Sequence, residues 1–153
     1  GNGTVKDSVL AARARGGIFD IGHGMGSFGW DTARGMMAQG FPPDVISSDV
    51  HTLCINGPAY DLVTTLSKFL PLGMSLPEII CASTEAPARA VRRPDLGTLR
   101  PGSAGDVSVL SLREGSFDLE DTLRETVTVP ERIFAEGCVI GGKWFQQVGK
   151  VVA

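Results

Sequence analysis

Apolar positions in the first half of the chain recur at helical spacing and are interrupted by glycines. Val9, Leu10 and Ala12 form an uneven apolar face that is followed by a pair of glycines. Residues with this spacing lie on one side of a helix, and glycine after them favours its end. The same reasoning predicts helices over residues 5–15, 30–39, 62–70, 76–83 and 86–93.

Two short apolar runs, 18–21 and 45–48, flank the second predicted helix. A strand, a helix and a strand with short connections predict two parallel strands and a right-handed crossover. Catalytic side chains of α/β barrels stand where such strands end. Here His23 follows the first run in a glycine-rich loop, and Asp49 ends the second, with His51 just beyond.

The last third of the chain changes to alternating apolar and polar residues. This pattern predicts short strands over residues 106–112, 125–129, 132–136, 138–140 and 143–147. Gly141-Gly142 separates the last two runs and favours a two-residue hairpin turn. The fold class we expect is therefore α/β plus β, with the β-rich part antiparallel.

The composition and charge of the chain indicate a globular protein and exclude a nucleic-acid-binding function. The chain has 153 residues, 42% of them hydrophobic and 20% charged, which is typical of a globular protein with a real core. Its formal charge is −3, and its basic cluster at Arg89, Arg92 and Arg93 is flanked by Glu85 and Asp95. A mixed cluster of this kind indicates a solvated helix face, so we expect no nucleic-acid partner.

We expect neither a membrane span nor a secretory leader. No apolar run has the length of a span, and the first residues contain no apolar leader region. Cys54, Cys81 and Cys138 are far apart and match no metal-binding spacing. We interpret them as reduced, small apolar residues, and the predicted location is cytoplasmic.

Several spaced motifs resemble the C-terminal region of the amidohydrolase superfamily. They are TEAPARA at 84–90, LGTLRPGSAGDVSVL at 96–110 and GCVIGGK at 137–143. FDIGHG at 19–24 and ISSDVH at 46–51 are similar to the dihydroorotase-like, deacetylase-type branch. Dihydroorotase itself has Asp-His-Ala-Pro-His where this chain has Asp49-Val50-His51-Thr52, which disfavours dihydroorotase activity.

The resemblance implies a (β/α)8 metal-dependent hydrolase barrel (a TIM barrel) with a small β-sandwich formed from both ends of the chain. Residues 1–95 would hold the last two barrel strands with their helices, and residues 96–153 the C-terminal part of the sandwich. The family's His-x-His, carboxylated lysine and mid-barrel histidines have no counterpart here. We expect them upstream of Gly1, so this chain would be a fragment that is inactive alone.

The resemblance also implies which residues form the active site and what each of them does. Asp49 would bind a divalent metal, zinc, which is binuclear in the complete enzyme and absent or weakly held in this chain. The same carboxylate would handle the proton of metal-activated water. His23, Gly24 and His51 are assigned to substrate binding. The predicted reaction is hydrolysis of the C–N bond of a small N-acylated substrate, with cyclic amide hydrolysis of the dihydroorotase or hydantoinase type as an alternative.

Alternative hypotheses for the same residues stay open. Asp49 could cap a turn after Ser47-Ser48, and His23 could be a structural loop residue. A non-catalytic alternative is that open strand edges pair with another copy of the chain or with the missing N-terminal part. The partner would then be a homo-oligomer or a heteromer. A β-rich binding module unrelated to hydrolysis is a third possibility.

Overall fold

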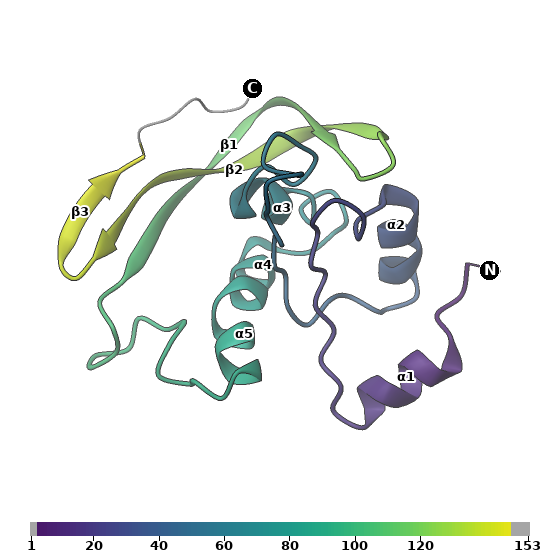
Figure 1. The fold of residues 1–153 in the computed structure, drawn as a ribbon, viewed down its shortest axis with the longest axis horizontal. Helices are drawn as coiled ribbons and strands as arrows, with labels where there is room; N and C mark the ends of the chain where they lie inside the picture. Colours follow the sequence, from purple (N-terminus) through teal and green to yellow (C-terminus); the bar gives the residue numbers. More distant parts are fainter. Residues whose placement is uncertain (1–2, 148–153) are drawn as a thin grey trace.

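The computed structural model describes residues 3–147, in which short helices precede an antiparallel sheet (Figure 1). The helices are α1 (Asp7–Ala14), α2 (Trp30–Ala38), α3 (Leu62–Ser67), α4 (Leu76–Ser83) and α5 (Glu85–Ala90). The strands are β1 (Val107–Glu120), β2 (Thr126–Ile140) and β3 (Lys143–Gln146), in that order across the sheet. Every predicted helix is confirmed, with ends that differ by a few residues at most.

The start of α4 shows how local chemistry fixes a helix end. The Glu78 carboxylate accepts hydrogen bonds from the Ser75 backbone N–H at 2.7 Å and from the Ser75 hydroxyl at 2.6 Å. These bonds hold the residue before the helix in place, and Ile79 on the inner face is 0% exposed. The predicted N-terminus of this helix is confirmed.

The prediction of several short strands over 125–140 was wrong, because these residues form the single strand β2. The breaks expected at Pro130 and Gly137 coincide with shifts in the register against β1, between Glu114 and Phe117 and between Val109 and Leu110. At such a bulge a residue needs no ladder hydrogen bond, so a proline or glycine is tolerated inside a continuous strand. The hairpin at Gly141-Gly142 is confirmed, with φ of 55° and 77° at the two glycines.

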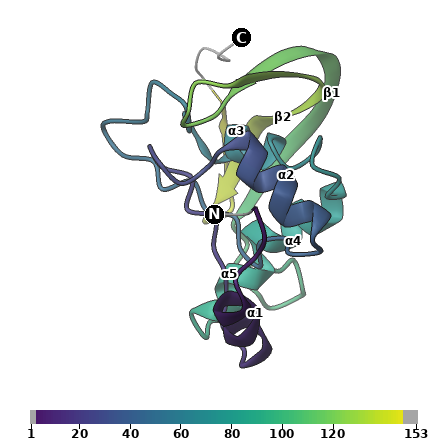
Figure 2. The ribbon, with the colours of Figure 1, turned by 90° about the vertical axis from the view of Figure 1, so that its right-hand side faces the viewer.

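The sheet curves over α3 and α2, while α1 lies at the opposite end of the molecule (Figures 1 and 2). The core fills the space between the sheet and the helices. Its most buried large side chains are Phe28, Trp30, Ile46, Phe69, Ile79, Leu119 and Ile133. Because strand β2 supplies part of this core, the helical and β-rich parts are packed together rather than separate.

Segments 18–21 and 45–48 lie side by side and run parallel, as the sequence predicts. Asp20 and Val45 form a parallel bridge, and the N–H of Ile21 donates to the Val45 carbonyl at 3.1 Å. The bridge is isolated because the Ser47 N–H donates to the Asp20 carboxylate instead of to backbone. The described residues do not form a closed barrel, so the predicted barrel and the division at residue 95 stay predictions.

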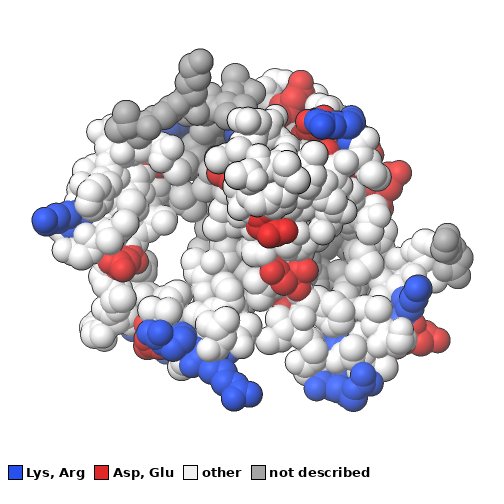
Figure 3. All heavy atoms as spheres, viewed as in Figure 1, with Lys and Arg blue, Asp and Glu red and all other residues white. Residues whose placement is uncertain are grey.

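The surface agrees with a solvated basic cluster. Arg89 pairs with Glu85 and Arg93 with Asp95, each at 2.6 Å, and these residues are largely solvent-exposed. Charges of both signs are spread over the face shown in Figure 3, and no broad basic area covers it. Within residues 3–147 no helix combines the length and apolar character needed to cross a membrane.

Candidate functional site

Asp49 stands where the second parallel segment ends, and its side chain lies in an open hollow. Asp20, Gly22, Ser47, Ser48 and Pro87 line the same hollow. Asp49 has a φ of 44°, in the left-handed region that non-glycine residues rarely adopt, so the chain turns sharply there. Asp49 is exposed, and among the described residues none donates a hydrogen bond to its carboxylate. It is not the cap of a helix; its carboxylate is available to a ligand.

Gly24 lies directly against the Asp49 carboxylate. A Cβ built on Gly24 would be only 2.7 Å from Asp49 Oδ2, and Gly24 has a φ of 46°. The backbone N–H of Gly24 donates to the Ser48 carbonyl at 2.9 Å, which joins the glycine-rich loop to the residue before Asp49. The structure therefore brings together Gly24 and Asp49, two of the residues that the sequence assigned to the site.

Gly24→Ala is expected to displace the Asp49 carboxylate and to lower the free energy of unfolding. The left-handed backbone alone costs about 1–2 kcal/mol for a residue with a Cβ. Urea denaturation measures the loss. Gly26→Ala in the same loop is the matched control, because a Cβ there meets nothing within 4 Å. Equal stability of the two variants would contradict the close approach of Gly24 to Asp49.

Asp20 is the second carboxylate of the hollow, but both of its carboxylate oxygens already accept hydrogen bonds from Ser47. Its Oδ1 accepts from the Ser47 N–H at 3.0 Å and its Oδ2 from the Ser47 hydroxyl at 2.5 Å. Through these bonds the Asp20 side chain joins the two parallel segments, because it is held by both the backbone and the side chain of Ser47. Asp20 is therefore a structural carboxylate, which leaves Asp49 as the acidic group of the hollow that can act on a ligand.

His23, which the sequence assigned to substrate binding, is buried and is not among the residues that line the hollow containing Asp49. The residue is 0% exposed, and its ring stacks on Phe28 with 5.0 Å between the ring centroids. Its Nε2 lies 2.7 Å from Lys68 Nζ, and its Nδ1 lies 3.0 Å from the Gly24 carbonyl oxygen. Burial, together with the charge of Lys68, lowers the pKa of His23 to about 4. The structure thus favours the alternative of a structural loop histidine.

Lys68 was not identified from the sequence. It is 0% exposed, and its Nζ donates to the Pro58 carbonyl at 2.9 Å and to the Glu120 carbonyl at 2.6 Å. Burial lowers the pKa of Lys68 to about 8, against the opposing effect of nearby Asp121. One signal could have drawn attention to it: a single lysine stands between helix α3 and the apolar pair that follows, Phe69 and Leu70.

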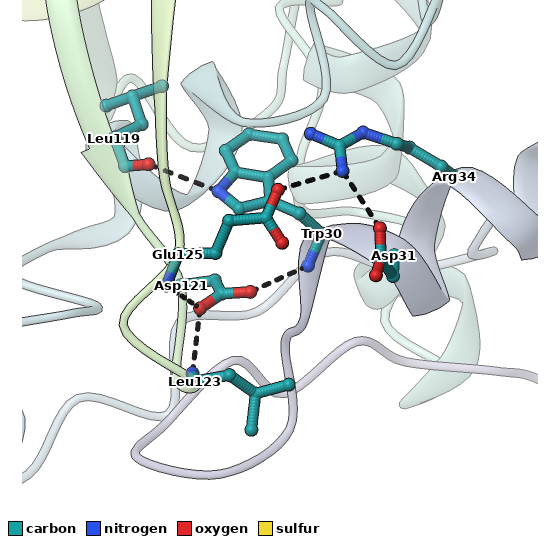
Figure 4. A network of polar contacts seen from close by, with 7 residues as sticks. All are labelled: Trp30, Asp31, Arg34, Leu119, Asp121, Leu123 and Glu125. Atoms are coloured by element: carbon teal, nitrogen blue, oxygen red, sulfur yellow. Dashed lines mark hydrogen bonds and ion pairs between the residues drawn. The ribbon is translucent and has the colours of Figure 1, made fainter.

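Asp121 is the buried carboxylate that joins the β1–β2 turn to helix α2 (Figure 4). Its Oδ2 accepts from the Trp30 N–H at 2.9 Å. Its Oδ1 accepts from the backbone N–H groups of Leu123 at 2.7 Å and Glu125 at 2.9 Å. Burial raises the pKa of Asp121, but these donors and Lys68 together lower it further, so it lies below the ordinary value. Asp121 was also missed from the sequence.

His51 lies in the turn beyond the strand end. Its Nδ1 accepts from the Leu53 N–H at 3.3 Å, and its carbonyl accepts from the N–H groups of Cys54 and Ile55. His51 is exposed, and its assignment to substrate binding stays a prediction. The buried Cys54 holds this turn, since its thiol contacts the Asp49 carbonyl at 3.5 Å.

The donor set in residues 3–147 does not fit a complete metal site. Nowhere in this range do three or more His, Cys, Asp or Glu side chains lie close enough together to hold an ion. Structural and catalytic zinc sites use at least three protein ligands. The described residues offer Asp49 to such a site and no further ligand beside it.

Comparisons with known proteins show which proteins this chain is similar to. No family model matches it. A deacetylase of Enterococcus faecalis (strain ATCC 700802 / V583) is 34% identical over 140 residues, which are 91% of this chain and 38% of that protein. A deacetylase of Agrobacterium fabrum (strain C58) is 36% identical over 115 residues, or 74% of this chain and 28% of that protein.

Two solved structures superpose on nearly the whole chain. An adenine deaminase has a TM-score of 0.90 and 33% identity, over 94% of this chain and 39% of its own. A dihydroorotase has a TM-score of 0.81 and 29% identity, over 92% of this chain and 38% of its own. The chain belongs to the amidohydrolase superfamily. This amidohydrolase chain spans less than two fifths of each of these relatives, and the resemblance found in its motifs is confirmed.

Proposed function

We propose that this amidohydrolase chain supplies the proton-transfer carboxylate, Asp49, of an enzyme that hydrolyses the C–N bond of a small N-acylated substrate. The observation that carries the proposal is the position of Asp49. It follows one of two parallel paired segments, is exposed in a hollow, and has a carboxylate to which the described residues donate no hydrogen bond. The relatives named deacetylase support an acyl group as the part released.

The fold that we propose for the complete protein is a (β/α)8 barrel with a β-sandwich. Segments 18–21 and 45–48 would be its last two strands, because they pair in parallel with α2 connecting them. Strands β1, β2 and β3 would belong to the sandwich. Domain bounds of 1–95 and 96–153 follow from this assignment.

In the proposed reaction, Asp49 moves one proton and is unchanged at the end. The attacking water gives a proton to the Asp49 carboxylate while its oxygen bonds to the acyl carbon. The protonated carboxyl then donates to the leaving nitrogen as the C–N bond breaks. The products are a carboxylic acid and an amine. The cofactor we propose is zinc, for which the described residues offer Asp49 and no complete ligand set.

Isolated, this chain is proposed to be inactive and to associate with itself or with a segment that completes the site. Apolar side chains on the sheet support association, because Ile140, Trp144 and Phe145 are 51–55% exposed. A non-catalytic, self-associating protein is therefore the second candidate. The proposed location is the cytoplasm, supported by three free cysteines.

Acetate release from a chimera tests the proposed function. In the chimera, this chain replaces the matched 140 residues of the Enterococcus faecalis deacetylase. A panel of N-acetyl compounds is the substrate. We expect Asp49→Asn to lower kcat by about a hundredfold, since it removes the proton acceptor. Asp31→Asn on the exposed side of α2 is the control. An Asp49→Asn chimera with the full rate would refute the proposal.

A further inference from the structure

A buried ammonium group, that of Lys68, contacts the glycine-rich loop that borders Asp49. Lys68 Nζ is within hydrogen-bond distance of three acceptors: the carbonyl oxygens of Pro58 and Glu120, and Nε2 of His23. An ammonium group carries three N–H donors, so each acceptor can take one. The acceptors come from the loop beyond Asp49, the end of β1 and the glycine-rich loop. Lys68 thus joins three segments that are far apart in the sequence.

The Lys68 contact determines which ring nitrogen of His23 carries the proton. Because Nε2 accepts from Lys68, the proton of the neutral ring lies on Nδ1, and Nδ1 donates to the Gly24 carbonyl at 3.0 Å. The plane of the ring is fixed as well, since it stacks on Phe28 with an interplanar angle of 9°. With the opposite tautomer, both hydrogen bonds would be lost.

Gly24 connects this ring to the site. Its carbonyl is held by His23 and its N–H by the Ser48 carbonyl, while its Cα faces the Asp49 carboxylate. The space at Gly24 is so small that a Cβ would be 2.7 Å from Asp49 Oδ2. A tilt of the Gly24 peptide must therefore change the space available to that carboxylate.

We propose that Lys68 is a positioning residue for Asp49, acting through the His23 tautomer and the Gly24 peptide. The inference rests on the proposed function only for the use of Asp49; the chain of contacts exists without it. A purely structural Lys68 would stabilise the fold without affecting the Asp49 carboxylate more than other buried polar residues do.

Nuclear magnetic resonance of the ¹⁵N-labelled chain tests the proposal. In the wild type we expect His23 to carry its proton on Nδ1 and none on Nε2; the opposite tautomer would overturn the proposal without any variant. Lys68→Met should shift the amide signals of Gly24, Ser48 and Asp49 and mix the tautomers. Ser67→Ala is the matched control, because Ser67 is also buried and hydrogen-bonded, to Val63 and Ile133.

Titration with Mn²⁺ adds a measurement, the broadening of the Asp49 signal, that does not depend on the stability of the fold. We expect Mn²⁺ to broaden the Asp49 signal in the wild type and in Ser67→Ala, and to broaden it less in Lys68→Met. Equal broadening and unshifted amides in the two variants would overturn the positioning role. If Mn²⁺ leaves Asp49 unaffected in the wild type, while Lys68→Met still shifts its amide, the positioning role stands, because it rests on the contacts within this chain. The proposed function is tested separately, by the rate of the chimera, since the described residues hold no complete metal site. If Lys68→Met does not fold, the wild-type tautomer decides.

Discussion

Asp121→Ala should lower the free energy of unfolding by about 3 kcal/mol or more, because each buried donor left unpaired costs about 1–3 kcal/mol. The substitution removes the acceptor of three backbone N–H groups, those of Trp30, Leu123 and Glu125. It also removes the negative charge that favours the buried ammonium of Lys68. The turn between β1 and β2 and the start of α2 would lose their connection.

Urea denaturation followed by circular dichroism measures the effect. Asp118→Ala is the control, since this exposed carboxylate on β1 accepts one hydrogen bond, from the Thr128 hydroxyl. Asp121→Asn keeps one oxygen acceptor and should lie between wild type and Asp121→Ala. If Asp121→Ala loses no more stability than Asp118→Ala, the network in Figure 4 does not hold these elements together.

Lowering the pH from 6.5 to about 4 should cost roughly 3 kcal/mol of stability through His23. Burial, followed by the charge of Lys68, lowers the pKa of His23 from 6.5 to about 4, and each pH unit in that window corresponds to about 1.4 kcal/mol. Within the window the unfolded chain binds a proton at this histidine and the folded chain does not. Stability is therefore full above pH 6.5 and falls as the pH drops toward 4.

Urea midpoints measured at several pH values between 7.5 and 4.5 follow this loss. His23→Gln should flatten the profile between pH 6.5 and 4.5, because the titrating ring is gone. His51→Gln is the matched control, because it replaces an exposed histidine and leaves the buried ring of His23 in place. A profile that is the same in wild type and His23→Gln would show that the ring does not stay neutral in the folded chain.

The sequence predicted the positions of the helices better than it predicted the pairing of the strands. The helices could be located because their apolar residues pack at regular spacing and their ends carry Gly, Ser or Pro. The continuity of β2 could not, because Pro130 and Gly137 break a strand in isolation and are tolerated here at bulges in the pairing of β1 with β2. Those bulges depend on the partner strand, which the local pattern does not show.

The site was predicted unevenly for the same reason. Asp49 was found because it ends a strand-like run and matches a family motif. The inward orientation of His23 depends on Lys68, which lies 45 residues away, and the role of Asp121 depends on Trp30, 91 residues away. The local sequence indicates that His23 follows a strand. The direction of its ring depends on the packing of distant residues and is seen only in the structure.

The metal content of the chimera with the Enterococcus faecalis deacetylase tests most directly whether Asp49 is a metal ligand. Zinc per chain, measured by atomic emission after dialysis, should fall in Asp49→Asn and stay at the starting value in Asp20→Asn. Asp20 lines the same hollow, but its carboxylate is already bound by Ser47. Unchanged zinc in Asp49→Asn, or an equal loss in both variants, would contradict the assignment of this carboxylate.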